Sequence, residues 1–353
     1  MTTVHVVVPD GIDDPRRPSG GNSYDRRLCR ELEASGWSVR ECAVPGSWPR
    51  PDAAARAAAA CLLAHIPDDA VVLLDGLVAC AIPEVLLPEA DRLRLVVLVH
   101  MPLGAAHAED EEVLAREGAT LSAAAAAVTT SAWTRDWLVR TYGLPTARVH
   151  VAVPGADLAS LAPGTDSGGA LLCVGALSPA KGHDMLLTAL AAVADRPWRC
   201  VCVGAMTSEP SFVADLARRA RDSGIADRIR FTGPLTAADL EDEYAAADAL
   251  VQPSLAETYG MVVTEALARG VPVIATTAGG LPEALGHGTG LARPGLLVPP
   301  GDPIALAAAL RCWLEDPGLR ERLRRTSRDR RRTLPTWPDT VALVDRVLGG
   351  LAP

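Results

Sequence analysis

The sequence predicts an α/β protein with two doubly wound, Rossmann-like domains. Short apolar runs of strand length recur along all 353 residues. Most of these runs are continuously apolar, which is typical of parallel strands covered on both faces. Stretches of about 10–18 residues with helical spacing separate them, and this alternation indicates βαβ units. The length of the chain gives room for two such domains.

Twelve segments are predicted as strands, six in each half of the chain. They are residues 4–9, 38–44, 70–76, 93–100, 126–131 and 149–155 in the first half, and 170–176, 199–205, 228–233, 249–254, 271–277 and 295–300 in the second. Helical patterns between them include residues 211–224 and 302–315. Ligands of doubly wound sheets bind beyond the carboxyl ends of the strands, so the residues that follow each strand are the candidates for function.

A segment rich in Pro, Gly, Ser and Asp, residues 158–169, predicts the connection between the domains. We therefore expect one domain over residues 1–163 and a second over residues 164–335. A break bounded by prolines precedes a last helical pattern. Residues 336–353 are predicted as a C-terminal helix, with the N-terminal domain as one place for it to pack.

The composition excludes several classes of protein. A formal net charge of −9 argues against electrostatic binding of nucleic acid. No apolar run reaches the roughly 18 residues of a membrane span, and the N-terminus lacks the pattern of a signal peptide. The eight cysteines form no framework, and Cys200 and Cys202 are expected to be buried free thiols. A cytoplasmic protein is predicted.

The most informative segment follows the predicted strand at residues 249–254. A helix is expected to start near Gly260 and to stop at Gly270. The first-turn N–H groups, near Gly260, Met261 and Val262, have no partner within the helix and lie at the positive end of its dipole. This end of the helix is therefore a candidate anion site.

Two glutamates flank this candidate anion site. Glu257 is expected in the loop before the helix, and Glu265 about one turn inside it. One interpretation is that each holds hydroxyls on one side of a bound anion, as a sugar–diphosphate–nucleoside would require. The other is that Glu257 only complements the helix dipole while Glu265 lies on the helix surface. Position alone leaves both open.

Further candidates lie in the first half of the chain. Gly20 and Gly21 precede a helix expected to start near Asn22 or Ser23, and the pair suits either a close ligand approach or a flexible loop. His100 and Asp75 each end a predicted strand. A lone histidine there is either structural or a ligand contact. Other candidates are Ser131, Thr134 and Arg135 at the start of a helix, where capping alone explains the serine.

The segment SLAETYGMVVTEALARGVPVIATTAGGLPEAL, residues 254–285, contains two glutamates eight positions apart. It resembles the signature of retaining glycosyltransferases of the GT-B fold, glycosyltransferase family 4 (glycosyl transferases group 1). Residues 174–190 and 295–302 resemble the family's phosphate-contact segment and its next element, and residues 19–32 its early glycine loop. The positions that carry the main match are Gly260, Glu265, Ala266, Gly270, Pro272, Val273, Gly279, Gly280 and Glu283.

The resemblance implies a nucleoside diphosphate sugar as donor, bound by the C-terminal domain, and an acceptor bound by the N-terminal domain, with a cleft between them. Glu265 would hold the ribose hydroxyls and Glu257 hydroxyls of the transferred sugar. Lys181 would neutralise the diphosphate as its bond to the sugar breaks. The remaining donor contacts implied are Gly20, Gly21, Tyr259, Gly260, Met261 and Val262. His100 would orient the sugar, and the acceptor contacts implied are Asn22, Asp75, Ser131 and Arg135.

One position departs from the family pattern. An arginine usually follows the glycine of the phosphate-contact segment, and this chain has Ala176 there. Another basic group in its place, weaker donor binding and lost activity are the three explanations. Otherwise the resemblance implies a hexosyltransferase that retains anomeric configuration and needs neither metal nor cofactor beyond its nucleotide-sugar co-substrate.

Two alternatives remain at this point: a sugar-nucleotide epimerase of the same architecture, and a sugar-nucleotide sensor without catalysis. A small soluble hydroxyl acceptor is favoured over a lipid, and no nucleic-acid partner is expected. The donor base, the acceptor and the oligomeric state are not set by these patterns.

Overall fold

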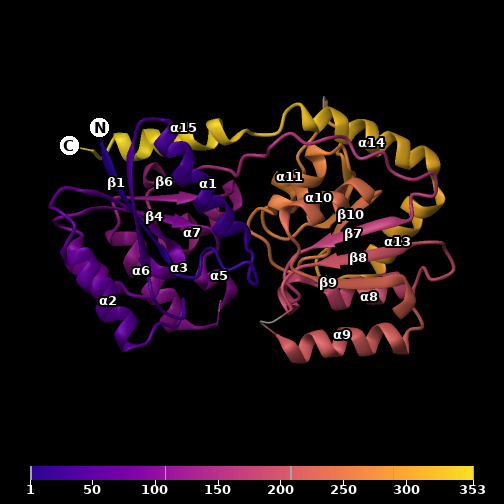
Figure 1. The fold of residues 1–353 in the computed structure, drawn as a ribbon, viewed down its shortest axis with the longest axis horizontal. Coiled ribbons are helices and arrows are strands. Elements are labelled where there is room, and N and C mark those ends of the chain that lie inside the picture. Colours follow the sequence, from indigo (N-terminus) through magenta and orange to yellow (C-terminus); the bar gives the residue numbers. More distant parts are fainter. Residues whose placement is uncertain (1, 108, 207–208, 289, 353) are drawn as a thin grey trace. The chain divides into compact units, whose positions relative to one another are not determined.

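The computed structural model describes residues 2–107, 109–206, 209–288 and 290–352. The chain forms two compact units (Figure 1). The N-terminal unit comprises Met1–Asp14, Gly21–Gly155 and Pro335–Pro353, and the C-terminal unit comprises Pro15–Gly20 and Ala156–Leu334. The last helix of the chain therefore belongs to the unit in which the chain begins.

The N-terminal unit contains a parallel six-stranded sheet in the order β2-β1-β3-β4-β5-β6. Its strands are β1 (Thr3–Pro9), β2 (Ser38–Val44), β3 (Val71–Asp75), β4 (Arg94–Val99), β5 (Ala126–Thr129) and β6 (Val149–Val151). All five residues of β3 are buried. This is the continuous burial expected of an inner strand with helices on both of its faces.

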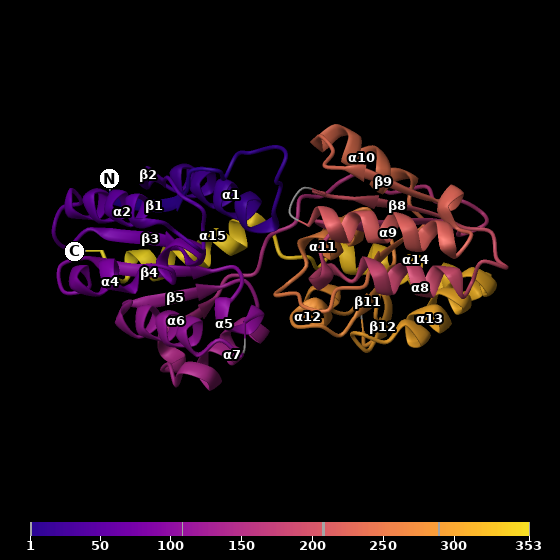
Figure 2. The ribbon, with the colours of Figure 1, turned by 90° about the horizontal axis from the view of Figure 1, so that it is seen from below.

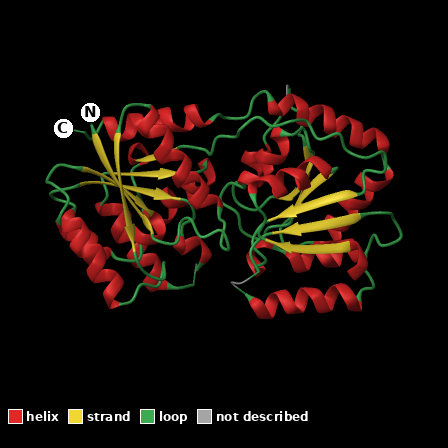
Figure 3. Cartoon of the chain, in the orientation of Figure 1, coloured by secondary structure: helices red, strands yellow, loops and turns green. Residues whose placement is uncertain are grey.

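Helices cover both faces of this sheet (Figure 3). They are α1 (Gly20–Ala34), α2 (Ala53–Ala64), α3 (Gly76–Ala79), α4 (Pro83–Leu86), α5 (Leu103–Ala106), α6 (Glu111–Ala123), α7 (Ala132–Tyr142) and α15 (Trp337–Gly349). Buried residues of α2, α4, α6 and α7 share one core with strand residues such as Leu74 and Val97. Contacts between α15 and α1 include Tyr24, whose ring lies edge-on to that of Trp337 at a centroid distance of 5.5 Å.

The C-terminal unit repeats this architecture with a parallel sheet in the order β12-β11-β10-β7-β8-β9. Its strands are β7 (Ala170–Val174), β8 (Arg199–Val203), β9 (Ile229–Gly233), β10 (Ala249–Gln252), β11 (Val273–Thr276) and β12 (Gly295–Val298). Its helices are α8 (His183–Ala191), α9 (Pro210–Asp222), α10 (Ala237–Ala246), α11 (Met261–Ala268), α12 (Leu281–Leu285), α13 (Pro303–Glu315) and α14 (Pro317–Arg331).

These helices form two layers (Figure 2). One layer contains α8 in contact with both α9 and α13, and the other contains α11 in contact with α12 and α14. The sequence explains where α13 begins. Asp302 caps its N-terminus by accepting hydrogen bonds from the backbone N–H groups of Ile304 and Ala305, and Pro303 occupies a first-turn position that needs no donor.

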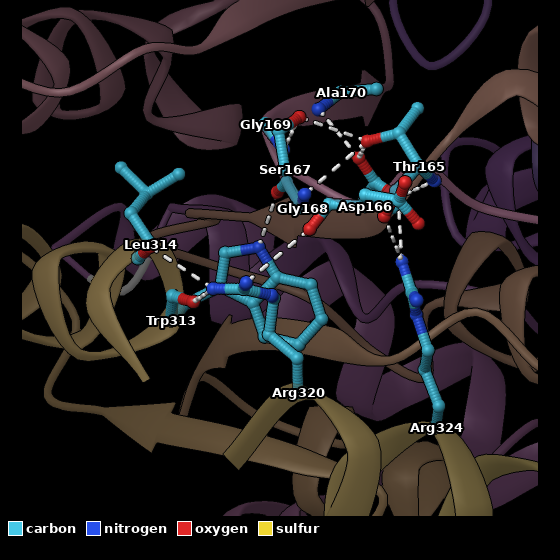
Figure 4. A network of polar contacts seen from close by, with 11 residues as sticks. Thr165, Asp166, Ser167, Gly168, Gly169, Ala170, Trp313, Leu314, Arg320 and Arg324 are labelled. Carbon is cyan, nitrogen blue, oxygen red and sulfur yellow. Dashed lines mark hydrogen bonds and ion pairs between the residues drawn. The ribbon is translucent and has the colours of Figure 1, made fainter. Parts of the chain in front are cut away.

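A network of polar contacts holds the segment that leads into β7, and Figure 4 shows Thr165, Arg320 and Arg324 within it. The side chain of Asp248, fully buried, accepts hydrogen bonds from the N–H of Thr165 at 2.5 Å, from its hydroxyl at 2.6 Å and from the N–H of Ala170 at 2.9 Å. Arg324 on α14 completes the set with an ion pair of 2.7 Å. Arg320, one turn earlier on α14, donates to carbonyl oxygens at the end of α13. The segment that enters β7 is therefore fixed by specific polar contacts.

The predicted α/β fold is confirmed, and each of the twelve predicted strands is present. Cys200 and Cys202 are buried free thiols, as expected. One boundary is wrong: α1 begins at Gly20, so Gly20 and Gly21 lie in the first turn of the helix and not before it. Among the described residues, no helix combines the length and apolarity needed to cross a membrane.

Candidate functional site

The N-terminus of α11 lies directly after the loop that leaves β10. Gly260 is the N-cap residue, and it adopts a φ of +96°, in the region where a residue with a side chain is strained. A Cβ atom there would also approach Leu281 to 2.7 Å. No side chain caps this helix among the described residues. The N–H of Val263 donates to the carbonyl oxygen of Gly260 at 2.9 Å, whereas those of Met261 and Val262 are left to a ligand or to water.

The turn that carries Lys181 is fixed against the same loop. Lys181 ends a short 3₁₀ segment, Pro179–Lys181, and Gly182 follows with a φ of +68°. A Cβ atom on Gly182 would overlap the carbonyl oxygen of Pro253. The N–H of Leu255 donates to the carbonyl oxygen of Ala180 at 2.8 Å. Close backbone packing thus sets the position of the lysine relative to the loop before α11.

Lys181 and Glu257 form an ion pair across these two segments. The distance from Lys181 Nζ to Glu257 Oε2 is 2.6 Å, and the side chains are 29% and 12% exposed. Glu257 Oε1 also accepts a hydrogen bond from the N–H of Thr258 at 3.3 Å. The interpretation of Glu257 as only a helix-dipole partner is therefore wrong, because a specific cation faces it.

The Gly279-Gly280 turn packs against the loop that carries Glu257. The N–H of Gly280 donates to the carbonyl oxygen of Glu257 at 3.0 Å. A Cβ atom on Gly280 would overlap the carbonyl oxygen of Thr258, so only glycine permits this approach. The adjacent Tyr259 is 3% exposed, and burial raises the pKa of its phenol. Its side chain therefore packs inside the unit, which leaves its backbone for the predicted donor contact.

Glu265 has a partner of its own. The hydroxyl of Tyr244 donates to Glu265 Oε2 at 2.7 Å, and the guanidinium of Arg269 lies 4.6 Å from the centroid of the tyrosine ring. Burial raises the pKa of Glu265, while the tyrosine hydrogen bond and Arg269 oppose that shift. Glu265 is thus half-buried and held by a hydrogen bond, which a plain position on the helix surface does not require. The two glutamates use separate partners.

The N-terminal unit contains a second cluster, built from Asp25, Asp75 and His100. His100 Nε2 and Asp25 Oδ1 are 2.7 Å apart. Asp75, at the end of β3, accepts a hydrogen bond from the N–H of Leu77 at 2.6 Å. One ligand-type atom from each of the three side chains lies within 4.8 Å of the others. His100 and Asp75, both predicted, therefore lie together, and Gly21 packs against the histidine ring.

The other residues predicted to contact the acceptor interact with neighbouring residues of the protein. The hydroxyl of Ser131 is buried and accepts the N–H of Thr134 at 3.0 Å, as an N-cap does. Arg135 donates to Asp136 at 2.9 Å. Asn22 lies in the first turn of α1, and it also has an interaction. Capping accounts for Ser131, and no other role for it follows from these contacts.

Sequence reasoning missed two residues that the structure adds, Asp25 and Tyr244. Asp25 lies on the buried face of α1 among Tyr24, Leu28, Cys29 and Leu32. A carboxylate at a position where the helical period demands an apolar residue is a usable signal of function.

The sequence held a second signal: Lys181 is the only lysine in a chain whose lysines and arginines total 34. A compact ammonium is not interchangeable with guanidinium, so its place at this site is informative.

Comparison with known proteins shows which family part of the chain matches and which solved structures share its fold. Residues 168–316 match the family described as Glycosyl transferases group 1, which confirms the predicted resemblance for this part of the chain. The solved structure of sucrose-phosphate synthase from Thermosynechococcus elongatus matches with a TM-score of 0.79 at 22% identity, over 99% of each chain. Anabaena Alr3699/HepE in complex with UDP-glucose gives 0.78 at 18% identity, over 99% of this chain and 100% of that one. The fold is GT-B.

Sequence comparison gives individual relatives that match about half of the chain. D-inositol 3-phosphate glycosyltransferase of Kineococcus radiotolerans is 38% identical over 213 residues, which cover 53% of this chain and 48% of that protein. The protein of the same name from Corynebacterium glutamicum is 36% identical over 225 residues, with 58% and 52% covered. The chain spans about half the length of the curated relatives it matches.

Proposed function

We propose that the protein is a glycosyltransferase that moves a hexose-type sugar from a nucleoside diphosphate sugar to a hydroxyl acceptor, with retention of anomeric configuration. The observation that carries the proposal is the site in the C-terminal unit. An uncapped helix N-terminus, a single lysine and two oriented carboxylates lie on segments that match group 1 glycosyltransferases.

The proposed donor contacts follow from this geometry. The first-turn N–H groups of α11 and the ammonium of Lys181 suit the diphosphate, because both offer positive charge to an anion. Glu265, held by Tyr244, suits the ribose hydroxyls, and Glu257 suits hydroxyls of the sugar. In the structure the ammonium of Lys181 is paired with the carboxylate of Glu257. Donor binding would therefore replace this carboxylate by the diphosphate as the anionic partner of the lysine.

The proposed catalytic contribution is electrostatic. Breaking the bond between sugar and diphosphate leaves charge on the diphosphate oxygen, and a fixed cation beside that oxygen stabilises the transition state more than the ground state. Ala176 supplies no charge where the family usually has an arginine. Lys181 would therefore carry a larger share of this stabilisation than in its relatives.

Candidate substrates come from the proteins that this chain resembles. UDP-sugars are the first donors to test, since the structural relative HepE is described in complex with UDP-glucose. D-inositol 3-phosphate belongs in the acceptor panel because of the names of the curated relatives. A small soluble acceptor, metal-independent turnover and a cytoplasmic location stay predictions.

A donor and acceptor panel tests the proposal. The protein is incubated with UDP-, GDP-, ADP- and TDP-sugars, with and without acceptors, and nucleotide release is followed. We expect release that depends on acceptor, unchanged by a chelator, and a product with the donor's anomeric configuration by NMR. Arg325→Ala, a change of an exposed arginine on α14, serves as the control. Isomerised sugar nucleotide without acceptor indicates the epimerase instead, and tight binding without turnover indicates the sensor.

A further inference from the structure

The cluster of Asp25, Asp75 and His100 contains an acceptor atom without a donor. Asp25 is 3% exposed and Asp75 is 4% exposed. Asp25 Oδ1 is engaged by His100 Nε2, while its other oxygen, Oδ2, is buried and has no hydrogen-bond partner. Desolvating a carboxylate oxygen without a donor or a cation costs several kcal/mol in general. Oδ2 of Asp25 therefore needs a hydrogen-bond donor or a cation in addition to the contacts described so far.

The neighbouring carboxyl group can supply it. A carboxylate oxygen of Asp75 lies within 4.8 Å of one of Asp25, and the negative charge of Asp25 acts on Asp75. Two ionised carboxylates at that separation only repel one another, but one shared proton converts the repulsion into a hydrogen bond. The orphan oxygen of Asp25 then has a donor.

We propose that Asp25 is a positioning residue whose Oδ1 fixes the imidazole of His100 while its Oδ2 shares a proton with Asp75, so that the three groups act as one proton-holding cluster. The proposal adds a residue to the site and rests on the proposed function only for its catalytic consequence.

The charges of the cluster agree with this assignment. Burial, followed by the negative charge of Asp25, raises the pKa of Asp75 to about 7. Burial alone would lower the pKa of His100, but the carboxylates of Asp25 and Asp75 outweigh it and raise that pKa above its ordinary value. Below about pH 7 the carboxyl group of Asp75 therefore keeps its proton. It acquires a negative charge as the shared proton leaves.

Two titratable neighbours of Asp25 on α1, Tyr24 and Cys29, do not change charge near pH 7. Tyr24, which precedes Asp25 on α1, has its ring 5.2 Å from that of His100 and donates its hydroxyl to the carbonyl oxygen of Ala152. Burial raises its pKa, and burial raises the pKa of Cys29, one turn along α1, to about 12. Both side chains stay neutral at physiological pH. The charge change of the cluster therefore belongs to its three members.

A bound metal ion fits the distances less well. Two ligands of one zinc ion at about 2.1 Å lie roughly 3.0–3.4 Å apart. The 2.7 Å between His100 Nε2 and Asp25 Oδ1 is a hydrogen-bond distance. Gly21 also fits the positioning role, since a Cβ atom there would come within 3.2 Å of the imidazole ring. The first turn of α1 is thus shaped to let the ring lie against it.

The functional consequence concerns a hydroxyl ligand of the N-terminal unit. A protonated Asp75 donates a hydrogen bond, and an ionised one accepts a hydroxyl proton. Acceptor binding to Asp75 would then change with the shared proton, and Nε2 of the histidine would keep its hydrogen in both the charged and the neutral ring.

NMR of the whole protein tests the cluster without relying on any activity. Aspartate ¹³Cγ and histidine ¹⁵N signals are followed from pH 5 to 9 in the wild type, Asp25→Asn and Asp75→Asn, with Asp69→Asn as control, an exposed aspartate paired with Arg94. We expect one carboxyl midpoint near pH 7 that disappears in Asp75→Asn and moves toward the ordinary range in Asp25→Asn. His100 should carry its hydrogen on Nε2, and its midpoint should fall in Asp25→Asn.

Several results would overturn the assignment. They are carboxyl midpoints that all lie in the ordinary range, or an Asp25→Asn variant in which the Asp75 and His100 midpoints do not change. Stoichiometric Zn²⁺ or Mn²⁺ that shifts the His100 nitrogen signals would replace the proton by a metal. If Asp25→Asn does not fold, the wild-type and Asp75→Asn titrations decide alone.

Under the proposed function, kcat/KM for the acceptor should show an inflection near pH 7 that is absent in Asp75→Asn. Absence of turnover would count against the proposed function and leave the NMR result standing.

Discussion

Replacing Lys181 by alanine should separate catalysis from stability. The ion pair with Glu257 is partly exposed, at 29% and 12% for the two side chains. Ion pairs of this kind stabilise a fold by about 0–1 kcal/mol, so the variant should remain folded. Removing a cation that meets developing charge costs about 3–4 kcal/mol of transition-state stabilisation, which is a loss of roughly 10²–10³ in turnover.

The assay measures acceptor-dependent nucleotide release at saturating donor, together with the thermal midpoint of unfolding. Lys181→Arg retains the charge with a different geometry and should lie between wild type and alanine, since a planar guanidinium does not reproduce the reach of an ammonium. Glu257→Gln weakens the proposed contact with hydroxyls of the sugar and retains the lysine, so it should raise KM for the donor more than it lowers kcat. Turnover of Lys181→Ala within about threefold of wild type would refute the role of the lysine.

Three further predictions concern donor binding, folding and pH. Glu265→Ala should weaken donor affinity at least about tenfold, because hydrogen bonds to a charged acceptor are worth about 1.5–3 kcal/mol each; titration calorimetry measures this, and unchanged affinity would contradict the ribose contact. Asp248→Ala should lower the free energy of unfolding by about 3–5 kcal/mol, since it leaves Arg324 and two N–H groups without their acceptor; a urea titration showing less than about 1 kcal/mol would contradict the anchoring role. Asp75 has a raised pKa of about 7 against an ordinary 3.8, so the native state binds more protons between these values. Wild-type stability should therefore fall relative to Asp75→Asn as pH rises from about 4 to 7, and parallel stability curves would argue against a raised pKa.

Sequence alone was sufficient for the fold because the strand signal was local. Continuously apolar runs such as residues 70–76 and 249–254 are buried strands in the structure, and glycines at 260 and 270 bound α11 closely. The helix N-terminus, the lysine and the glutamates could be singled out as candidates because short segments of chain set each of them.

Partners between distant segments were not predictable in this way. Tyr244 meets Glu265 only because α10 and α11 lie side by side, a tertiary fact with no local signature. Asp25 was missed, although its position among the buried residues of α1 follows the helical period. The start of α1 was also predicted too late, since glycines were taken to end a loop when they instead let a ring pack against the first turn.

The most direct test of the central claim uses the single lysine. Reductive methylation with ¹³C-formaldehyde labels Lys181, the only lysine of the chain, and the α-amino group, and it keeps the positive charge. Nucleoside diphosphates and monophosphates are then titrated into the labelled protein. The account predicts that the Lys181 methyl signal shifts with a diphosphate and shifts far less with the matching monophosphate. A Lys181 signal that stays in place with every nucleoside diphosphate would contradict the claim that this lysine holds the donor diphosphate.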